Sequence, residues 1–325
     1  MLKVFTFRRA WNYLVLRISY LFALLTKNPV IHGMPVSLAI EPACLCNLHC
    51  PECPLGENKL QRQTGIMNIE TYKKIVDETA SHCGYLLLYF QGEPYMNHSL
   101  FDMAAYAVKK RMYTVTSTNG HFLNEENIKK TIQSGLDKII ISVDGLSQDT
   151  YSKYRKGGDF QKVMYGIARL AALKKQFKVK KPFIELQFLV FRHNESEIRK
   201  VKKLKKQLNV NKVRLKSAQI YDFRDNEMLP PLQEKYSRYR QLENGSFTIK
   251  SRLPNRCWRM WSSCVITWDG RVVPCCFDKN ADHETGNIND SQLKDIWRNK
   301  NYQTFRGKIF TSRKEIPVCR NCTSK

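Results

Sequence analysis

Six stretches that favour β-strands alternate with helix-like stretches between Pro35 and Ala218, and this alternation restricts the fold more than any other feature. The first strand-like stretch is VSLAIE, residues 36–41, and the last is KVRLKSA, residues 212–218. Strands that alternate with helices in this way are typical of parallel strands joined by crossover helices. The sequence therefore predicts an α/β fold with functional groups at the carboxyl ends of its strands.

The other predicted elements complete this pattern. The remaining strands are YLLLYFQ (85–91), MYTVTST (112–118), KIIISVD (138–144) and FIELQFLVF (183–191). The crossover helices are expected at residues 68–80, 99–110, 125–135, 160–175 and 195–208, from their helical periodicity. Asn68 is the expected N-cap of the first helix and Gly135 the expected C-cap of the third. The pattern dissolves into a polar connection at residues 222–256, where one helix is expected.

Four cysteines lie in ten residues, CLCNLHCPEC, directly after the first predicted strand. Three of them have the spacing Cys46-x-x-x-Cys50-x-x-Cys53, and three thiolates can hold a cubane cluster while leaving its fourth iron open. A structural zinc site would need four ligands, usually as two separated pairs. Cys44 lies outside the spacing and is expected not to be a ligand. Zinc and unreactive thiols remain the alternatives.

The total of eleven cysteines is odd and occurs in a chain of 325 residues. Disulfide frameworks are typical of much smaller secreted chains. A reducing, cytoplasmic environment is therefore expected, with most thiols acting as ligands or as small buried hydrophobic groups.

The C-x3-C-x2-C spacing and its position after a strand resemble the radical S-adenosylmethionine (radical SAM) superfamily. The resemblance covers about residues 35–217 and implies a partial, TIM-like (β/α)6 barrel. In that family the open iron of a [4Fe-4S] cluster binds S-adenosylmethionine. The resemblance implies that reductive cleavage of this cofactor gives a 5′-deoxyadenosyl radical, which abstracts hydrogen from an unactivated carbon of the substrate.

Later strand ends carry further family-like residues. FQGEP, residues 90–94, resembles the element that binds the methionine amino group, with Gln91 in place of its first glycine. Gly92 permits close backbone approach, and the Glu93 carboxylate can offset a positive ammonium. The predicted cofactor-binding residues are Gly92, Glu93, Pro94, Asn119, Ser142, Asp144, Arg155 and Gln187. Among them Ser142 resembles a ribose-binding residue, and Arg155 is expected to pair with the methionine carboxylate. No catalytic acid or base can be named.

A second cysteine-rich segment begins at Cys257 and resembles the SPASM and twitch extensions of radical SAM enzymes. Cys257, Gly270 and Cys275 match the order that opens those extensions. The thiols suffice for one auxiliary [4Fe-4S] cluster, for which the expected ligands are Cys257, Cys275, Cys319 and Cys322. Successive side chains on a strand diverge, so only one of Cys275 and Cys276 is expected to bind. Cys264 is expected to be a buried small hydrophobe, and zinc at the same four thiols is the alternative.

Four thiolates would leave no open iron, so the auxiliary cluster is expected to accept an electron in an oxidation. The predicted substrate is a small polyol, sugar or other metabolite, with a reducing donor such as flavodoxin or ferredoxin. A peptide maturase is the second hypothesis, although about 34 residues before the first strand are too few for a leader-binding domain. A non-enzymatic iron–sulfur electron carrier would not need the barrel residues.

The formal charge of +25 favours anionic partners. The basic runs along the fourth and fifth helices are interpreted as solvated faces, because nucleic-acid binding would also call for exposed aromatic residues. The stretch at residues 10–25, AWNYLVLRISYLFALL, is short for a membrane span and contains Arg17. It predicts either a helix packed on the protein core or an amphipathic helix on an anionic membrane, so membrane association stays open.

The expected organisation has four parts. They are an amino-terminal helical extension (1–33), a core barrel (34–225), a connecting segment (226–256) and an auxiliary-cluster domain (257–325).

Overall fold

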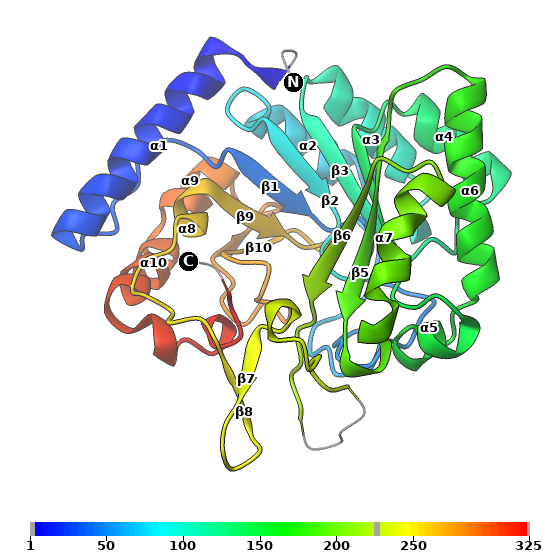
Figure 1. The fold of residues 1–325 in the computed structure, drawn as a ribbon. Helices are drawn as coiled ribbons and strands as arrows, with labels where there is room; N and C mark the ends of the chain where they lie inside the picture. The colour runs from blue at the N-terminus through cyan, green and yellow to red at the C-terminus, as the bar shows by residue number, and fades with distance from the viewer. Residues whose placement is uncertain (1–3, 224–227, 324–325) are drawn as a thin grey trace. The chain divides into compact units, whose positions relative to one another are not determined.

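The computed structural model describes residues 4–223 and 228–323, and these residues form two compact units (Figure 1). The described parts of the first unit are residues 4–45, 61–114 and 251–323, and those of the second are residues 46–60, 115–223 and 228–250. The segment 34–225, expected to form one barrel domain, thus contributes to both units.

The strand order in the first unit shows why this unit contains residues from both the beginning and the end of the chain. Its strand order is β11-β10-β9-β1-β2, so a strand from the carboxyl-terminal segment lies beside β1. Ser37 of β1 aligns with Tyr85 of β2 on one side and with Ser263 of β9 on the other, both in parallel. Strands β9 and β10 form a hairpin with its turn at Asp269-Gly270, and Gly270 has the positive φ of 88° that such a turn favours. The strands are β1 (Ser37–Ile40), β2 (Tyr85–Leu88), β9 (Ser263–Ile266), β10 (Arg271–Val273) and β11 (Gly286–Asn287).

Helices of the first unit come from all three of its segments. They are α1 (Phe7–Thr26), α2 (Ile69–Thr79), α3 (Leu100–Lys109), α8 (Arg259–Ser262), α9 (Leu293–Arg298) and α10 (Lys300–Ser312). The described residues also include the short 3₁₀ helices η2 (Pro94–Met96), η5 (Arg313–Glu315) and η6 (Pro317–Cys319). Asn68 is the N-cap of α2 as predicted, since its side chain accepts the Glu70 N–H. Among the described residues, no helix combines the length and apolar character needed to cross a membrane.

The second unit contains the parallel strands β3 to β6 in sequential order. They are β3 (Tyr113–Thr118, paired with β4 from Val115 onward), β4 (Lys138–Ser142), β5 (Phe183–Val190) and β6 (Lys212–Ser217). The crossover helices are α4 (Glu125–Gln133), α5 (Gln148–Tyr154), α6 (Phe160–Gln176) and α7 (Ile198–Gln207), with the 3₁₀ helix η3 (Arg192–Glu197) before α7. All six predicted strands and all five predicted crossover helices are therefore present.

Alternation along β5 fixes which face of the second unit's sheet is covered. Phe188 and Val190 pack against Ile198 and Val201 of α7 in one buried cluster. Residues of odd number on β5, including Gln187, point to the other face of the sheet. In Figure 1, α7 lies beside β5 and β6, and α4 packs along α6.

Two local predictions need correction. Helix α4 ends with Ser134 as its C-cap, and Gly135 follows the cap with a φ of +72°. In the described part of the connection there is no α-helix but a 3₁₀ helix, η4 (Glu234–Tyr236), and an antiparallel hairpin of β7 (Tyr239–Gln241) and β8 (Phe247–Ile249). The hairpin forms because Asn244-Gly245 is a strong turn signal between two strand-like runs, and Gly245 has a φ of +80°.

Candidate cofactor and metal sites

The loop with the first cysteines belongs to the second unit and is wrapped by apolar side chains. Cys50 is buried in a cluster with Leu48, Tyr154 and Phe191, and Cys46 and Cys53 pack against the same cluster. Burial raises the pKa of the Cys50 thiol to about 11, and nearby Arg155 opposes this shift. The three predicted ligands are thus brought to one largely apolar region, with Cys50 buried and Cys46 and Cys53 half-buried.

Arg155 connects this loop to the end of β4. Its Nη1 lies 3.7 Å from the Cys50 Sγ, and its Nε and Nη2 donate to Asp144 Oδ2 at 2.7 and 2.6 Å. The other Asp144 oxygen accepts the Leu189 N–H at 2.6 Å. Burial alone would lower the pKa of Arg155, but the Asp144 carboxylate raises it well above its usual value. The guanidinium that was predicted to meet the methionine carboxylate is therefore held by Asp144 and the cysteine loop.

Asn119 follows β3 and also reaches the cysteine loop. Its amide Nδ2 donates to Asn47 Oδ1 at 2.8 Å and lies 3.8 Å from the Cys46 Sγ. The Asn119 Oδ1 accepts the backbone N–H of His121 and also lies 3.1 Å from the His121 Nδ1. Because the Asp159 N–H donates to His121 Nε2, the ring proton must be on Nδ1. His121 therefore fixes the orientation of the Asn119 side chain, a role that the sequence did not indicate.

Ser142 and Gln187 lie on neighbouring strands. They are direct partners in the parallel register of β4 and β5, and the Val143 N–H donates to the Gln187 carbonyl at 2.9 Å. Asp144 lies two residues after Ser142, just beyond the end of β4. A second buried amide was missed by the sequence prediction: Asn194 donates to the Asp144 and Leu189 carbonyls and so fixes the strand ends.

Gly92, Glu93 and Pro94 belong to the first unit. A Cβ at Gly92 would lie 2.4 Å from the Ala43 carbonyl oxygen, and its φ of +70° also favours glycine. The Glu93 N–H donates to the carbonyl of Leu45, the residue that precedes Cys46 in the chain. The buried Glu93 carboxylate accepts the Tyr95 N–H at the start of η2. Gly92 therefore permits the close backbone approach expected of it.

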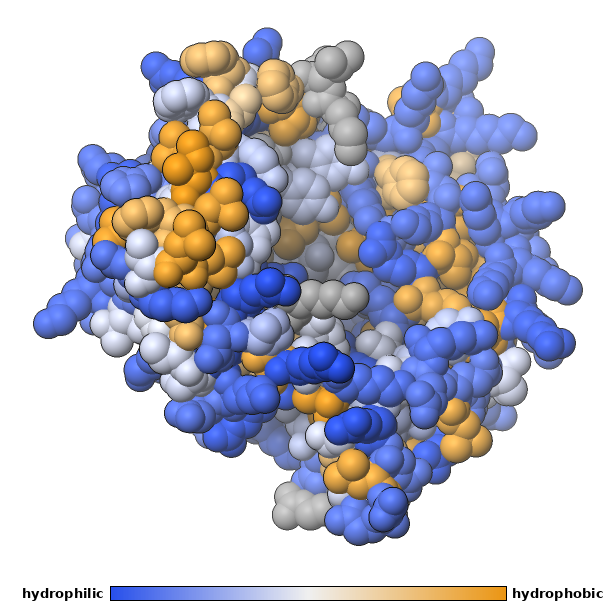
Figure 2. Space-filling view, turned by 60° about the vertical axis from the view of Figure 1, so that its left-hand side comes forward, coloured by the Kyte–Doolittle hydropathy of each residue, from blue (hydrophilic) through white to orange (hydrophobic). Residues whose placement is uncertain are grey.

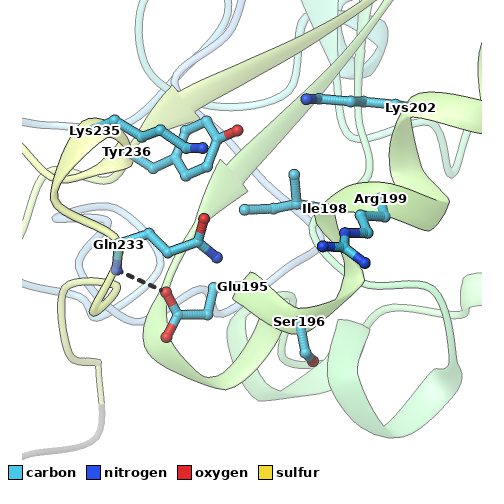
Figure 3. Close-up of a pocket in the computed structure, with 8 residues that line it drawn as sticks. All are labelled: Glu195, Ser196, Ile198, Arg199, Lys202, Gln233, Lys235 and Tyr236. Carbon is cyan, nitrogen blue, oxygen red and sulfur yellow. Dashed lines mark hydrogen bonds between the residues drawn. The ribbon is translucent and has the colours of Figure 1, made fainter.

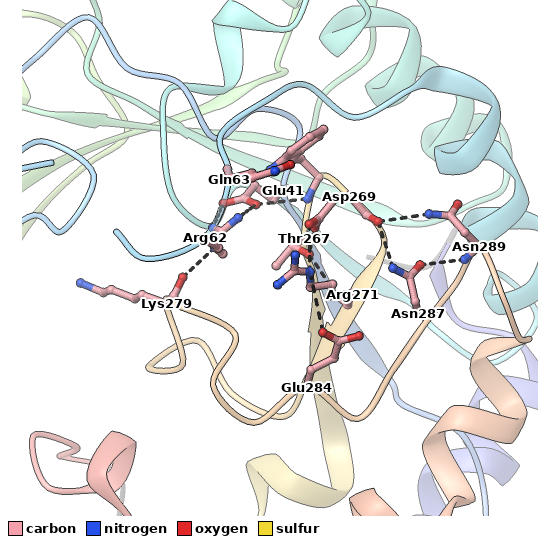
Figure 4. A network of polar contacts seen from close by, with 11 residues as sticks. Glu41, Arg62, Gln63, Thr267, Asp269, Arg271, Lys279, Glu284, Asn287 and Asn289 are labelled. Atoms are coloured by element: carbon pink, nitrogen blue, oxygen red, sulfur yellow. Dashed lines mark hydrogen bonds and ion pairs between the residues drawn. The ribbon is translucent and has the colours of Figure 1, made fainter. Parts of the chain in front are cut away.

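A buried ion pair lies at the end of β1 and was not predicted. Figure 4 shows Glu41 in contact with Arg62, and the two side chains are almost completely inaccessible. The Glu41 carboxylate also accepts the N–H groups of Gln91 and Trp268, while Arg62 donates to the Lys279 carbonyl. The Glu41–Arg62 pair thus connects the end of β1 and the residue 62 loop to Gln91, Trp268 and Lys279 of the first unit.

Cys44 is fully buried near the same carboxylate. Burial raises the pKa of its thiol to about 12, and Glu41 adds to the shift. Its backbone N–H donates to the Gly65 carbonyl.

The second cysteine segment encloses a small apolar cavity within the first unit. The four thiols predicted as ligands all line it, namely Cys257, Cys275, Cys319 and Cys322. Its other walls are the side chains of Arg259, Met260, Phe277, Phe305, Ile309, Arg313 and Val318. Burial raises the pKa of Cys319 to about 11 and that of Cys257 above its usual value.

Two arginines place positive charge at this cavity. Arg313 lies 3.7 Å from the Cys322 Sγ through Nη2, and Arg259 donates to the Cys276 Sγ at 2.7 Å.

A hydrogen bond with Cys275, followed by the Arg259 charge, lowers the pKa of Cys276 to about 6. Cys276 packs against the apolar cluster that contains Val265 rather than lining the cavity. Cys264 is fully buried, as expected of a small hydrophobic residue.

The donor sets suit iron–sulfur clusters. No three His, Cys, Asp or Glu side chains among the described residues are arranged to bind a single metal ion. Thiolates of a cubane cluster bind different irons, so they need not converge on one point. Three thiols in one apolar loop and four around one apolar cavity, with arginines beside both, fit anionic thiolate clusters.

A separate pocket of about 520 Å³ lies on the second unit, lined by η3, α7 and residues 233–236 (Figure 3). The Gln233 N–H donates to Glu195 at its edge, and Arg199, Lys202 and Lys235 supply positive charge. None of the predicted cofactor residues lines this pocket.

Comparison with known proteins agrees with this arrangement. The family model of the radical SAM superfamily matches residues 40–213, and that of SPASM, an iron–sulfur cluster-binding domain, matches residues 257–323. The tungsten-containing aldehyde ferredoxin oxidoreductase cofactor-modifying protein of Pyrococcus furiosus is 26% identical over 323 residues, covering 88% of this chain and 86% of that protein.

Two further similarities cover most of the chain. The PqqA peptide cyclase of Gluconobacter oxydans is 25% identical over 318 residues, covering 90% of this chain and 83% of that protein. The crystal structure of BtrN in complex with AdoMet and 2-DOIA superposes with a TM-score of 0.56 at 21% identity, covering 90% of this chain and 95% of that one. The fold is therefore the mixed α/β, partial TIM-like barrel expected from the alternation of strands and helices.

The family model covers more than half of the chain, and the cysteines meet the chemical needs of its cofactors. The chain is therefore an enzyme of the radical SAM superfamily that uses S-adenosylmethionine and a [4Fe-4S] cluster, and it carries an auxiliary iron–sulfur centre in a SPASM domain.

Proposed function

We propose that this enzyme oxidises a small polyol, sugar or similar metabolite by removing two hydrogens from it. The observation that carries the proposal is the gathering of four cysteines around one small, mainly apolar cavity. Four thiolates would complete the coordination of an auxiliary cluster and leave no iron for the substrate, so this site suits electron transfer. An oxidation is the outcome that needs such an electron acceptor.

In this proposal, Cys46, Cys50 and Cys53 hold the first cluster. The residues that bind S-adenosylmethionine are Gly92, Glu93, Pro94, Asn119, Ser142, Asp144, Arg155 and Gln187. The auxiliary ligands are Cys257, Cys275, Cys319 and Cys322. When bound, the first cluster and its cofactor supply a 5′-deoxyadenosyl radical that can remove hydrogen from an unactivated carbon.

The chain's own residues position and shield these groups. Arg155 links the Cys50 thiol to Asp144, and Asn119 lies beside the Cys46 thiol. Since two of the Arg155 nitrogens contact Asp144 and a third lies near the Cys50 thiol, Arg155 would also hold the loop and balance thiolate charge, in addition to its proposed contact with the cofactor. The apolar cluster around Leu48 buries the Cys50 thiol and partly covers the other two.

Around the auxiliary site, Arg259 and Arg313 balance thiolate charge, and apolar side chains exclude water. The proposed oxidation balances when one hydrogen atom leaves on 5′-deoxyadenosine, one proton goes to solvent, and one electron leaves through this site. A reduced flavodoxin or ferredoxin would supply the electron that starts each cycle.

The second candidate is a peptide substrate. The similarity to PqqA peptide cyclase, which spans 90% of this chain, favours it. The same electron balance would apply to a crosslink between two peptide residues.

Each proposed function is assigned to one range of the sequence. Residues 34–225 would carry the radical reaction, residues 257–325 the auxiliary cluster, and residues 226–256 the connection between them.

The test uses protein reconstituted without oxygen, S-adenosylmethionine and dithionite. Sets of deuterated polyols, sugars and peptides are screened for deuterium transfer to 5′-deoxyadenosine by mass spectrometry. The proposal requires transfer from a polyol or sugar and a product two hydrogens lighter than the substrate. A product of unchanged oxidation level refutes the proposed oxidation, and transfer from peptides alone favours the second candidate.

A pair of variants tests the auxiliary site. The Cys319→Ser/Cys322→Ser variant should reduce the iron content from about eight to about four atoms per chain and abolish the oxidised product. Cleavage of S-adenosylmethionine should survive. Cys264→Ser, which changes a buried thiol outside the cavity, is the control and should keep all the iron. Zinc instead of iron at these four thiols of the wild type would contradict the assignment.

A further inference from the structure

Helix α1 carries a continuous stripe of large apolar side chains on its exposed face (Figure 2). The stripe consists of Phe7, Trp11, Leu14, Ile18, Leu21, Phe22 and Leu25. Successive members are mostly three or four residues apart, which places them on one side of a helix. From Phe7, which is 81% exposed, to Leu25, which is 84% exposed, the stripe runs for about 27 Å. Isolated apolar residues on a surface are normal, but a contiguous stripe of this size indicates an interaction site.

The opposite face of α1 is fixed to the first unit by buried hydrogen bonds. The Arg9 guanidinium donates to the backbone carbonyls of Ala80, Lys110 and Arg111 at 2.6 to 3.1 Å. Asn12 exchanges two hydrogen bonds of 2.8 Å with the backbone of Met34. Turning the stripe inward would break all of these bonds, so its exposure is a fixed property of the unit.

Apolar packing holds the same inner face. Leu16 and Ala23 are fully buried, and the Tyr20 ring packs against those of Trp258 and Trp261 at centroid distances of 5.2 Å. The helix therefore has two apolar sides. One of them belongs to the core of the unit, and the other has no partner among the described residues.

The charges of α1 are all positive. The helix sequence contains three arginines and neither aspartate nor glutamate, and its C-cap is Lys27. Arg8 and Arg17 are exposed beside the stripe, and Arg17 also lies over the Trp258 ring at 4.8 Å. Aromatic side chains such as Trp11 and Tyr13 are exposed on the same helix and suit the boundary between lipid headgroups and acyl chains. This combination fits an anionic lipid surface.

We propose that α1 binds in the plane of an anionic membrane and holds the first unit on its surface. The apolar stripe would enter the headgroup region, with Arg8, Arg17 and Lys27 facing lipid phosphates. A second copy of this chain is a poorer fit, because pairing two α1 helices would bring arginines together without a carboxylate on either helix. The proposal stands independently of the substrate and of the radical reaction.

The experiment is co-sedimentation of the full, reconstituted chain with vesicles. One set contains phosphatidylcholine and phosphatidylglycerol in equal amounts, and the other contains phosphatidylcholine alone. The Ile18→Glu/Leu25→Glu variant should bind the anionic vesicles about tenfold more weakly than the wild type. The matched control is Tyr165→Glu/Leu232→Glu, which makes the same changes of charge at two exposed apolar residues outside α1 and should bind like the wild type.

Charge and folding are tested separately. The Arg8→Gln/Arg17→Gln variant should lose binding to anionic vesicles, and added salt should weaken wild-type binding. Circular dichroism and the iron–sulfur absorbance show whether each variant keeps its fold. The proposal is overturned if the wild type does not bind anionic vesicles, if both glutamate variants bind equally, or if light scattering shows a dimer that only Ile18→Glu/Leu25→Glu dissociates.

Discussion

The Arg62 guanidinium donates to both oxygens of the Glu41 carboxylate, at 2.8 and 2.6 Å, and both side chains are almost completely buried. Glu41 stands at the end of β1, a few residues before the cysteine loop, and Arg62 follows that loop in the chain. Because Glu41 also accepts the Gln91 and Trp268 N–H groups, it joins the end of β1 to the end of β2 and to the β9–β10 hairpin. A charge in this position is tolerated only while its partner is present.

Replacing Arg62 with methionine should destabilise the protein by about 3–5 kcal/mol, because the Glu41 charge would remain buried without a partner. Denaturant unfolding measures the difference. Replacing both residues, as Glu41→Leu/Arg62→Met, should recover part of the loss. Lys59→Met, which breaks the exposed pair of Lys59 with Glu57, is the control and should have a far smaller effect. Equal losses from the two single variants would contradict this interpretation.

Gly92→Ala should weaken binding of S-adenosylmethionine and lower stability, because the added Cβ would collide with the Ala43 and Leu45 backbone. Gly245→Ala is a matched control: its φ of +80° is similarly unfavourable for alanine, but its Cβ would meet nothing within 4 Å. Equilibrium binding of S-adenosylmethionine, measured under anaerobic conditions, distinguishes the two variants. If both variants bind it equally well, the close approach at Gly92 is not needed for the cofactor.

Arg155→Lys should lower the rate of S-adenosylmethionine cleavage by about 10–100-fold. Substitutions of residues that contact metal ligands, as Arg155 contacts the Cys50 thiol, commonly have effects of this size. Lysine keeps the charge but cannot contact Asp144 and the Cys50 thiol together through a planar group. The measurement is 5′-deoxyadenosine formed per cluster, with iron content determined in parallel. Arg169→Lys, which alters an exposed pair with Glu125 in the same unit, should leave the rate unchanged.

Stability should fall in mild acid because of His121. Burial, followed by the charge of Lys162, lowers the pKa of this imidazole below its usual value. Its Nε2 accepts the Asp159 N–H, so protonation there would break that bond. The unfolded chain takes up the proton at about pH 6.5, before the folded chain does. The contribution is therefore complete above that pH and is lost as the pH falls toward the lower pKa of the folded state.

The thermal midpoint of the wild type should accordingly drop more between pH 7.5 and pH 5.5 than that of His121→Gln, which has no imidazole to protonate. Calorimetry at the two pH values gives both midpoints. Parallel changes in the two proteins would show that His121 does not control this pH response.

Much of the barrel follows from local patterns in the sequence. The isoleucine run of β4 and the alternation of β5 favour strands strongly, and Asn68 is a capping residue for a physical reason that needs no distant contact. The cysteine spacing was equally informative, because the proposed ligands of one cluster lie within eight residues.

What the sequence did not predict depends on distant contacts. Nothing near Ser263 indicates that β9 pairs with β1, more than 200 residues earlier in the chain. The Glu41–Arg62 pair was missed because either residue alone reads as a surface charge. The hairpin at Asn244-Gly245 could have been predicted, since its turn signal is local, but the polar composition around it favoured a helix.

Cys46, Cys50 and Cys53 of the first loop are the proposed ligands of the cluster that cleaves S-adenosylmethionine. Protein reconstituted without oxygen is mixed with S-adenosylmethionine and dithionite, and 5′-deoxyadenosine is measured by chromatography. The wild type and Cys44→Ala should both form it, whereas Cys46→Ala, Cys50→Ala and Cys53→Ala should form none. If the wild type holds its full iron content and yields no 5′-deoxyadenosine, or if those three thiols hold zinc, the account is wrong.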